Sequence, residues 1–165
     1  FDIAVLDGGF PKWKLENRPT EEAVPFMSNR HFTVRYQNAM IRTKAQVLEL
    51  SKLGGSEVID ARPPTRFKGE EPEPRAGLRS GHIPGSKNVF YNDLINKNGT
   101  MKKPEEIRAQ FKDSGIDFAK PAITTCGSGI TAAILNLGFS LIGKSDHSLY
   151  DGSWAEWGAL PDIKN

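Results

Sequence analysis

The fold is decided by the stretch Pro121-Ala122-Ile123-Thr124-Thr125-Cys126-Gly127-Ser128-Gly129-Ile130-Thr131-Ala132. Its first five residues are a short, mainly apolar and β-branched run, which predicts a buried strand. Its glycines indicate a tight turn, and behind the turn apolar side chains recur at the spacing of one helix face. These side chains are Ile130, Ile134, Leu137 and Leu141. A buried strand is therefore expected to turn directly into a helix that carries these four side chains on one face.

Cys126 is the only cysteine of the chain, and its place in this turn favours a reactive thiol. We expect Gly127 and Gly129 to take positive φ angles, so that the amide N–H groups of the turn curl around one point. Such a nest at a helix N-terminus stabilises anions, and cysteines placed there have lowered pKa values and act as thiolate nucleophiles. The alternative is an inert, buried cysteine that only fills space. The glycine turn and the helix start favour the nucleophile.

Three segments carry a resemblance to a known family. They are Cys126-Gly127-Ser128-Gly129-Ile130-Thr131-Ala132, Val58-Ile59-Asp60-Ala61-Arg62 and Ser80-Gly81-His82-Ile83-Pro84-Gly85-Ser86. The first resembles the active-site loop of the rhodanese superfamily, in the form found in 3-mercaptopyruvate sulfurtransferases. The other two resemble the paired segments that precede the catalytic cysteine in these domains. The resemblance extends from about residue 25 to about residue 160. It implies a sulfurtransferase that needs no cofactor.

The resemblance also implies the roles of the site residues. Cys126 would take the sulfur of 3-mercaptopyruvate as a persulfide and release pyruvate, and a thiol acceptor such as thioredoxin or a small thiol, or cyanide, would then remove that sulfur. Ser128 would join a serine, histidine and aspartate relay whose other members lie in a first domain. Arg66 and Arg75 match the substrate-binding arginines, and arginine suits bidentate recognition of a carboxylate. The remaining substrate-binding positions are those of the loop: Gly127, Gly129, Ile130 and Thr131.

Two other residues of the matching segments are expected to have structural roles. His82 is interpreted as a histidine that bonds the loop backbone, and Asp60 as a carboxylate that holds the loop around Arg62. Neither is assigned a chemical step.

The chain alternates between strand and helix patterns. Strands are predicted at residues 31–35, 58–61, 88–90, 121–125 and 148–150. Helices are predicted from Thr43 to about Leu53, from Pro104 with Ile107 and Phe111 on one face, and after Cys126. We therefore expect an α/β fold of the rhodanese type, with a mostly parallel five-stranded sheet flanked by helices on both faces. Ligands of such sheets bind beyond the carboxyl ends of the strands, where Cys126 falls.

An internal repeat bears on the domain organisation. Leu6-Asp7-Gly8-Gly9-Phe10-Pro11-Lys12-Trp13 matches Tyr150-Asp151-Gly152-Ser153-Trp154-Ala155-Glu156-Trp157 in its Asp-Gly core and its last tryptophan. The alternative is chance, because Asp-Gly turns are common. We expect residues 1–20 to be the tail and linker of a missing N-terminal rhodanese domain, with a first strand at residues 2–6, and residues 21–165 to be the catalytic rhodanese domain. The missing domain is then a partner of this chain, and the true N-terminus is not present.

Composition excludes several classes of function. A net charge of +2 with interspersed lysines and acids does not favour nucleic-acid or membrane binding, and no apolar stretch approaches the roughly 20 residues of a membrane span. The three histidines and one cysteine show no metal-ligand spacing, and no glycine motif for nucleotides occurs. A single cysteine allows no internal disulfide, so a reducing compartment, cytoplasmic or mitochondrial, is expected.

Three alternatives to mercaptopyruvate chemistry are weighed. A thiosulfate sulfurtransferase is expected to carry cationic side chains just after the cysteine, where this chain has the neutral Gly127 and Ser128. A cysteine phosphatase needs an arginine six residues after the nucleophile, where this chain has Ala132. A noncatalytic rhodanese-like binding module would have lost the cysteine, whereas Cys126 is retained.

Overall fold

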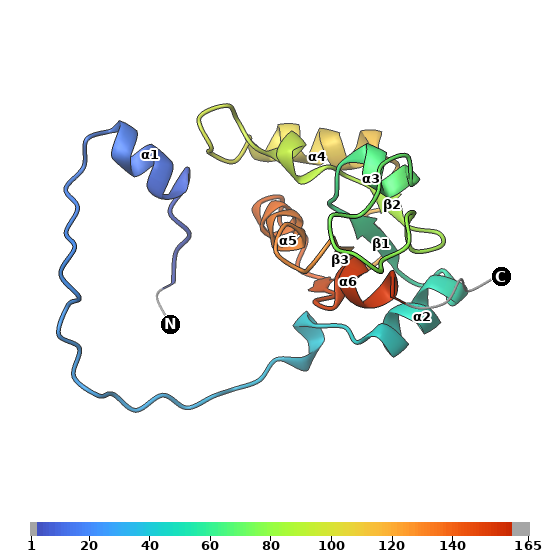
Figure 1. Ribbon diagram of the computed structural model, residues 1–165, viewed down its shortest axis with the longest axis horizontal. Coiled ribbons are helices and arrows are strands. Elements are labelled where there is room, and N and C mark those ends of the chain that lie inside the picture. Colours follow the sequence, from blue (N-terminus) through green and yellow to red (C-terminus); the bar gives the residue numbers. More distant parts are fainter. Residues whose placement is uncertain (1–2, 160–165) are drawn as a thin grey trace.

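The structure, a computed structural model, describes residues 3–159 and is built around one parallel sheet (Figure 1). The sheet contains Glu57–Asp60 (β1), Lys87–Asn88 (β2), Ala122–Thr125 (β3) and His147–Leu149 (β4), in the spatial order β2-β1-β3-β4. All three pairings are parallel. The expected rhodanese-type α/β fold with a parallel sheet is confirmed, with four strands instead of five.

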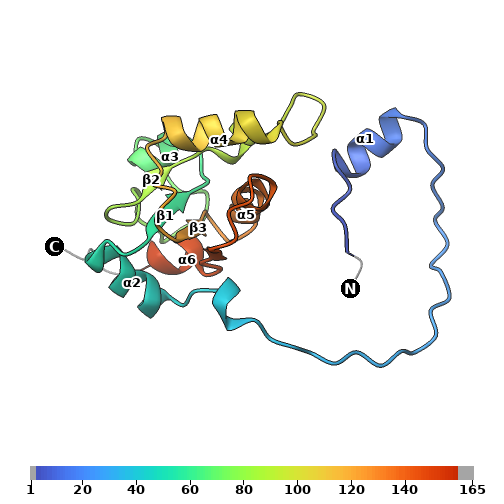
Figure 2. The ribbon, with the colours of Figure 1, turned by 180° about the vertical axis from the view of Figure 1, so that it is seen from behind.

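Helices cover both faces of this sheet (Figures 1 and 2). The helices of the described chain are Gly9–Leu15 (α1), Lys44–Leu53 (α2), Pro64–Lys68 (α3), Pro104–Asp113 (α4), Ala132–Leu141 (α5) and Ser153–Trp157 (α6), of which α1 lies apart from the sheet in both views. Two short 3-10 helices, Asn38–Met40 (η1) and Tyr91–Leu94 (η2), complete the regular structure of the described chain.

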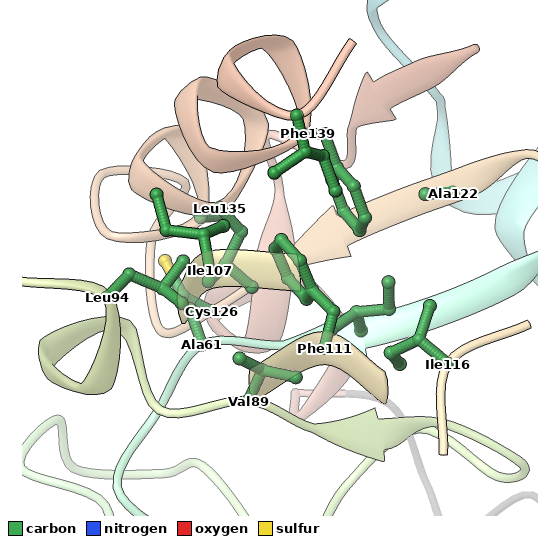
Figure 3. Close-up of a cluster of buried hydrophobic side chains, with 13 residues drawn as sticks. Ala61, Val89, Leu94, Ile107, Phe111, Ile116, Ala122, Cys126, Leu135 and Phe139 are labelled. Atoms are coloured by element: carbon green, nitrogen blue, oxygen red, sulfur yellow. The ribbon is translucent and has the colours of Figure 1, made fainter. Parts of the chain in front are cut away.

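Side chains from the sheet divide the core into two clusters. Ile59 and Ala122 pack with α4 and α5 on one face, whereas their neighbours Val58 and Ile123 pack with α2 and α6 on the other. This division follows from the alternation of side chains along a strand. Figure 3 shows the first cluster, in which the rings of Phe111 and Phe139 stack with their centroids 4.1 Å apart. Cys126 lies within this cluster.

The start and end of α2 agree with the sequence. Thr43 is the N-cap residue and forms a capping box, because its side chain accepts from the Gln46 N–H and its own N–H donates to Gln46 Oε1. Gly54 ends the helix in the left-handed conformation that a glycine adopts without strain.

The predicted strand at residues 31–35 is wrong. This segment lies outside regular secondary structure, and its side chains are exposed. Further along the chain, Ile41 pairs with Leu149 of β4 through an isolated parallel bridge. A β-branched and aromatic composition favours a strand only where a neighbouring strand offers unpaired backbone groups. Because only a bridge forms beside β4, the fifth strand is missing.

The apolar row noted in the sequence of α5 is not its buried side. The buried side of the helix is formed by Ala132, Leu135, Gly138 and Phe139. Ile130 precedes the helix and is 76% exposed, and Leu141 is exposed as well. Ile134 and Leu137 are only partly buried. The helix is apolar around most of its circumference, so its hydrophobic spacing fits more than one face. Ile134, Leu137 and Leu141 line a groove whose wall also contains Val5 and Leu6.

The N-terminal segment contacts the domain through Asp7, whose Oδ1 accepts from the Met101 N–H at 2.8 Å. Residues 3–6 form no strand, and residue 2 lies outside the described residues, as do residues 160–165 of the expected domain. The two copies of the repeat have similar backbone φ angles at one pair of equivalent positions: +57° at Gly9 and +48° at Ser153. A short helix follows in both, although the preceding glycines differ, with φ +86° at Gly8 and −56° at Gly152.

Within residues 3–159, no helix is long and apolar enough to span a bilayer. In the same part of the chain, no three His, Cys, Asp or Glu side chains are grouped so that they could hold a metal ion.

The stacked pair in the first cluster makes a stability prediction. We expect Phe111→Ala to lower the free energy of unfolding by about 3–5 kcal/mol, because it removes a fully buried ring and leaves a cavity beside Phe139. Phe26→Ala, at a ring that is 97% exposed, is the matched control and is expected to change it by about 0.5 kcal/mol or less. Urea unfolding measures both values, and equal effects would contradict the described core.

His147 makes a prediction about pH. Burial lowers the pKa of His147, with Asp146 acting in the opposite direction and Lys144 adding to the decrease. Its Nε2 lies 3.0 Å from Ser140 Oγ, and its buried Nδ1 finds no hydrogen-bond partner among the described residues. The folded state therefore disfavours the protonated ring.

Since the unfolded chain protonates this histidine at about pH 6.5, the free energy of unfolding is expected to fall as the pH drops below that value. Urea titrations from pH 7 to pH 5 measure this slope. His147→Gln should flatten it, whereas His31→Gln, at an exposed histidine, should leave it unchanged. An unchanged slope in His147→Gln would show that another group causes the dependence.

Candidate active site

A cavity of about 360 Å³ lies at the carboxyl edge of the sheet, where β3 ends at Thr125. Its wall contains most of the site residues predicted from the sequence: Cys126, Gly127, Ser128, Ile130, Thr131, Arg66 and Arg75. A larger cavity, of about 660 Å³, surrounds the amino ends of β3 and β4 near Asp146. The first cavity is the candidate active site, because it contains the only thiol of the chain.

Cys126 directly follows β3 and is 2% exposed. Its side chain borders both the hydrophobic cluster of α4 and α5 and the cavity (Figure 3). The Ser128 N–H points at Cys126 Sγ with a distance of 3.5 Å from nitrogen to sulfur. An amide donor therefore faces the sulfur, as expected for a loop that stabilises an anion there.

The two glycines of the loop act differently from one another. Gly129 has φ +84°, and a Cβ at this position would lie 2.6 Å from Asp151 Oδ1, so both conformation and space require glycine. The expected positive φ at Gly127 is wrong. A Cβ there would lie 3.3 Å from Arg66 Nη2, so Gly127 allows a close approach between the loop and a guanidinium. Gly129 lies against Asp151 and is not part of the cavity wall.

The two predicted arginines reach the cavity from outside the cysteine loop. Arg66 is on α3, and its Nε donates to Glu73 Oε1 at 3.2 Å while its Nη2 donates to Glu73 Oε2. This hydrogen bonding with Glu73 raises the pKa of Arg66. Arg75 Nη1 lies 3.4 Å from the carbonyl oxygen of Gly127, and Arg75 forms no ion pair with the carboxylates of residues 3–159. Its charge is thus available to an anionic ligand.

A buried network of ion pairs holds one of these arginines, Arg66, in place. Arg62 is 1% exposed and donates from Nε and Nη2 to Asp60, from Nη1 to Glu73 at 2.7 Å, and from Nη2 to the Gly81 carbonyl at 2.8 Å. Glu73 therefore joins Arg62 to Arg66. The expected role of Asp60 in holding Arg62 is confirmed.

Sequence reasoning missed Arg62 and Glu73 as parts of the cavity wall. Glu73 is one of three glutamates in the run Glu70-Glu71-Pro72-Glu73, and no local pattern distinguishes the buried one.

The other predicted residues are placed as follows. Ser128 is half-buried in the cavity wall, Ile130 is exposed at its mouth, and Thr131 is at the N-cap of α5 without a side-chain capping bond. His82 donates from Nδ1 to the Phe67 carbonyl, 2.8 Å away, and stacks on the Phe67 ring. The structural interpretation of His82 is therefore confirmed.

Behind the cysteine loop, α6 binds the backbone of that loop. The Trp154 N–H donates to the Cys126 carbonyl at 2.8 Å, and the Ala155 N–H donates to the Gly127 carbonyl at 3.0 Å. The Cys126 N–H donates to Ser153 Oγ at 3.1 Å. These contacts were also missed, although the Asp-Gly repeat marks the segment.

Residues 43–160 match the family model described as the rhodanese-like domain. The chain belongs to the rhodanese family. It is 41% identical over 155 residues to mouse 3-mercaptopyruvate sulfurtransferase, an alignment that covers 94% of this chain and 52% of the mouse protein. Rat thiosulfate sulfurtransferase is 39% identical, with 94% of this chain and 52% of that protein covered.

A solved structure agrees with the sequence relatives. The crystal structure of SseA from Escherichia coli, described as a 3-mercaptopyruvate sulfotransferase, has a TM-score of 0.81 and 33% identity to this rhodanese chain. The match covers 93% of this chain and 57% of SseA. The chain thus spans about half the length of the relatives that it matches.

The Glu73 carboxylate, which pairs with both Arg62 and Arg66, is expected to be essential for the stability of the fold. Glu73→Gln should lower the free energy of unfolding by about 3–5 kcal/mol, because it leaves the buried Arg62 guanidinium without one of its compensating charges. Glu70→Gln changes a carboxylate that is 59% exposed and is expected to cost about 0.5 kcal/mol or less. Thermal and urea unfolding measure both variants. If Glu73→Gln is as stable as Glu70→Gln, the network does not support the site.

Proposed function

We propose that this rhodanese chain is the catalytic part of a 3-mercaptopyruvate sulfurtransferase. The observation that carries the proposal is that Cys126 lines the same cavity as Arg66 and Arg75. A thiol beside guanidinium groups suits a substrate that has a sulfur at one end and a carboxylate at the other. The names of the mouse and Escherichia coli relatives support the same substrate.

The proposed reaction begins with the Cys126 thiolate. It attacks the thiol sulfur of 3-mercaptopyruvate, so that a sulfur–sulfur bond forms and the bond between that sulfur and C3 breaks. The electron pair of the broken bond goes to C3 as the pyruvate enolate, which takes up one proton to give pyruvate. Cys126 is left as a persulfide. The amide N–H of Ser128 faces the inner sulfur, Cys126 Sγ.

A second half-reaction restores the cysteine. A thiolate acceptor attacks the outer sulfur of the persulfide, becomes a persulfide itself and releases the Cys126 thiolate. Thioredoxin or a small thiol is proposed as this acceptor; cyanide would attack the same outer sulfur and leave as thiocyanate, again releasing the Cys126 thiolate. Because the nucleophile must remain a thiol between turnovers, a reducing compartment, cytoplasmic or mitochondrial, is proposed as its location.

Arg75 and Arg66 are proposed to share the binding of the substrate carboxylate. Arg75 has no carboxylate partner among the described residues, whereas Arg66 is partly neutralised by Glu73. Ser128, half-buried in the same wall, is proposed to polarise the substrate carbonyl together with residues of another domain. Ile130 and Thr131 are proposed to complete the substrate-binding wall.

The domain assignment rests on the repeat. Residues 1–20 are proposed to be the end and linker of a preceding rhodanese domain, and residues 21–165 the catalytic domain. The shared positive φ at Gly9 and Ser153, each followed by a short helix, supports a common origin of the two segments.

Two alternatives are less well supported. Thiosulfate is a dianion, and the loop positions Gly127 and Ser128 supply no side-chain charge to bind it. For a phosphatase, Ala132 stands where the phosphate-binding arginine is needed, and it is fully buried at the start of α5.

The experiment that tests the proposal is an intact mass measurement after incubation with 3-mercaptopyruvate, and separately with thiosulfate, under non-reducing conditions. A gain of about 32 Da, one sulfur atom, is expected with mercaptopyruvate and to a smaller extent with thiosulfate. Cys126→Ser should show no gain.

If thiosulfate gives the larger yield, the assigned donor is wrong. If neither donor adds sulfur, the measurement is repeated with the N-terminal domain of a full-length relative added. Failure there as well would contradict a sulfurtransferase.

A further inference from the structure

Ser153 has an unusual conformation for its residue type. Its φ of +48° lies in the left-handed region, which residues with a Cβ rarely adopt. The residue is completely buried, and its hydroxyl accepts from the Cys126 N–H and donates to the Tyr150 carbonyl at 2.8 Å. A strained residue that persists in a buried position points to a role that outweighs the strain.

The internal repeat shows that this role is not to shape the backbone. In the first copy the equivalent position is Gly9, which takes nearly the same φ, +57°, and is also followed by a short helix. Glycine therefore satisfies the backbone of this turn with less strain than serine. The hydroxyl is what distinguishes Ser153 from Gly9, and only the second copy lies behind a cysteine loop.

The hydrogen bonds around Ser153 also explain the orientation of the cysteine loop. In a planar trans peptide the C=O and the N–H point in opposite directions. Trp154 and Ala155 hold the carbonyls of Cys126 and Gly127, so the N–H groups of the two following residues are turned to the opposite side. One of these is the Ser128 N–H, which faces Cys126 Sγ. The start of α6 thus turns loop amides toward the sulfur.

We propose that Ser153 is a positioning residue for the sulfur-transfer site: its hydroxyl holds the Cys126 N–H, and so keeps the loop carbonyls on α6 and the loop amides on the reacting sulfur. The proposal rests on the proposed function, because it assumes that an anionic sulfur at Cys126 is the reactive species. It assigns Ser153 no contact with the substrate, since Ser153 does not line the cavity.

Two substitutions separate the hydroxyl from the backbone strain. Ser153→Ala removes the hydroxyl and keeps a Cβ at positive φ, whereas Ser153→Gly removes the hydroxyl and accepts that φ. Ser148→Ala, at another buried serine outside the cavity, is the matched control. Iodoacetamide is the probe, and intact mass gives the alkylation rate of Cys126 at one fixed pH. Urea unfolding gives the stability of each variant.

Both Ser153 variants are expected to be alkylated about five- to tenfold more slowly than the wild type, as for the loss of one hydrogen bond in a network around a charged group. Ser153→Gly should nevertheless be more stable than Ser153→Ala, so that the rate does not follow stability. Ser148→Ala should be alkylated at the wild-type rate. Alkylation of Ser153→Gly as fast as the wild type, or faster, would overturn the proposal, as would rates that fall in proportion to stability.

Alkylation needs no sulfur donor, so its outcome is independent of whether 3-mercaptopyruvate is the substrate. Where the wild type does form a persulfide, the two variants should lower its maximal rate of formation. The mercaptopyruvate concentration for half-maximal rate should change less than about twofold, because the proposed carboxylate ligands Arg66 and Arg75 are untouched. An increase in that concentration with an unchanged maximal rate would overturn the positioning role.

Discussion

The buried guanidinium of Arg62 is the interaction on which the rest of the site depends. A charge that is 1% exposed must have its lost hydration replaced completely, and Arg62 finds this replacement in Asp60, in Glu73 and in the Gly81 carbonyl. Its flat face lies 4.5 Å from the ring of Trp154 in α6. One side chain thus fixes the end of β1, two loops and α6 relative to each other. A lysine could not do this, because it lacks the planar set of five donors.

Both parts of the site are attached to this centre. Through Glu73, Arg62 holds Arg66 at the cavity, and through Trp154 it contacts the helix whose first amides bind the Cys126 and Gly127 carbonyls. The nucleophile and the cationic groups therefore come from segments distant in sequence but share one buried support. A shared buried support of this kind preorganises the two groups relative to each other.

The elements that were predictable from sequence are those set by local chemistry. The cap at Thr43, the apolar strand before Cys126 and the glycine turn each follow from a few neighbouring residues. Segment 31–35 was mispredicted, and the buried side of α5 could not be chosen, because apolar composition does not tell which surface a side chain will meet. Hydrophobic spacing alone cannot choose between two apolar faces of one helix.

The candidate site follows the same rule. Cys126, Arg66 and Arg75 were named from the sequence through a recognisable loop and its resemblance, and the structure brings them to one cavity. Glu73 and Ser153 were not, because their importance lies in long-range contacts to Arg62 and Cys126. A glutamate among several glutamates and a serine in a common turn carry no local sign of such contacts.

The close approach at Gly127 has a consequence for how this loop could diverge. A Cβ at this position would lie 3.3 Å from Arg66 Nη2, which is closer than most such contacts, so the end of the flexible Arg66 side chain would have to move by a few tenths of an ångström to admit a larger residue. A cationic side chain added there would also stand beside the Arg66 guanidinium, so the two like charges would repel each other in the cavity. The charge of the cavity wall can therefore be changed at Gly127 at a modest steric cost, without a change in the buried support behind Cys126.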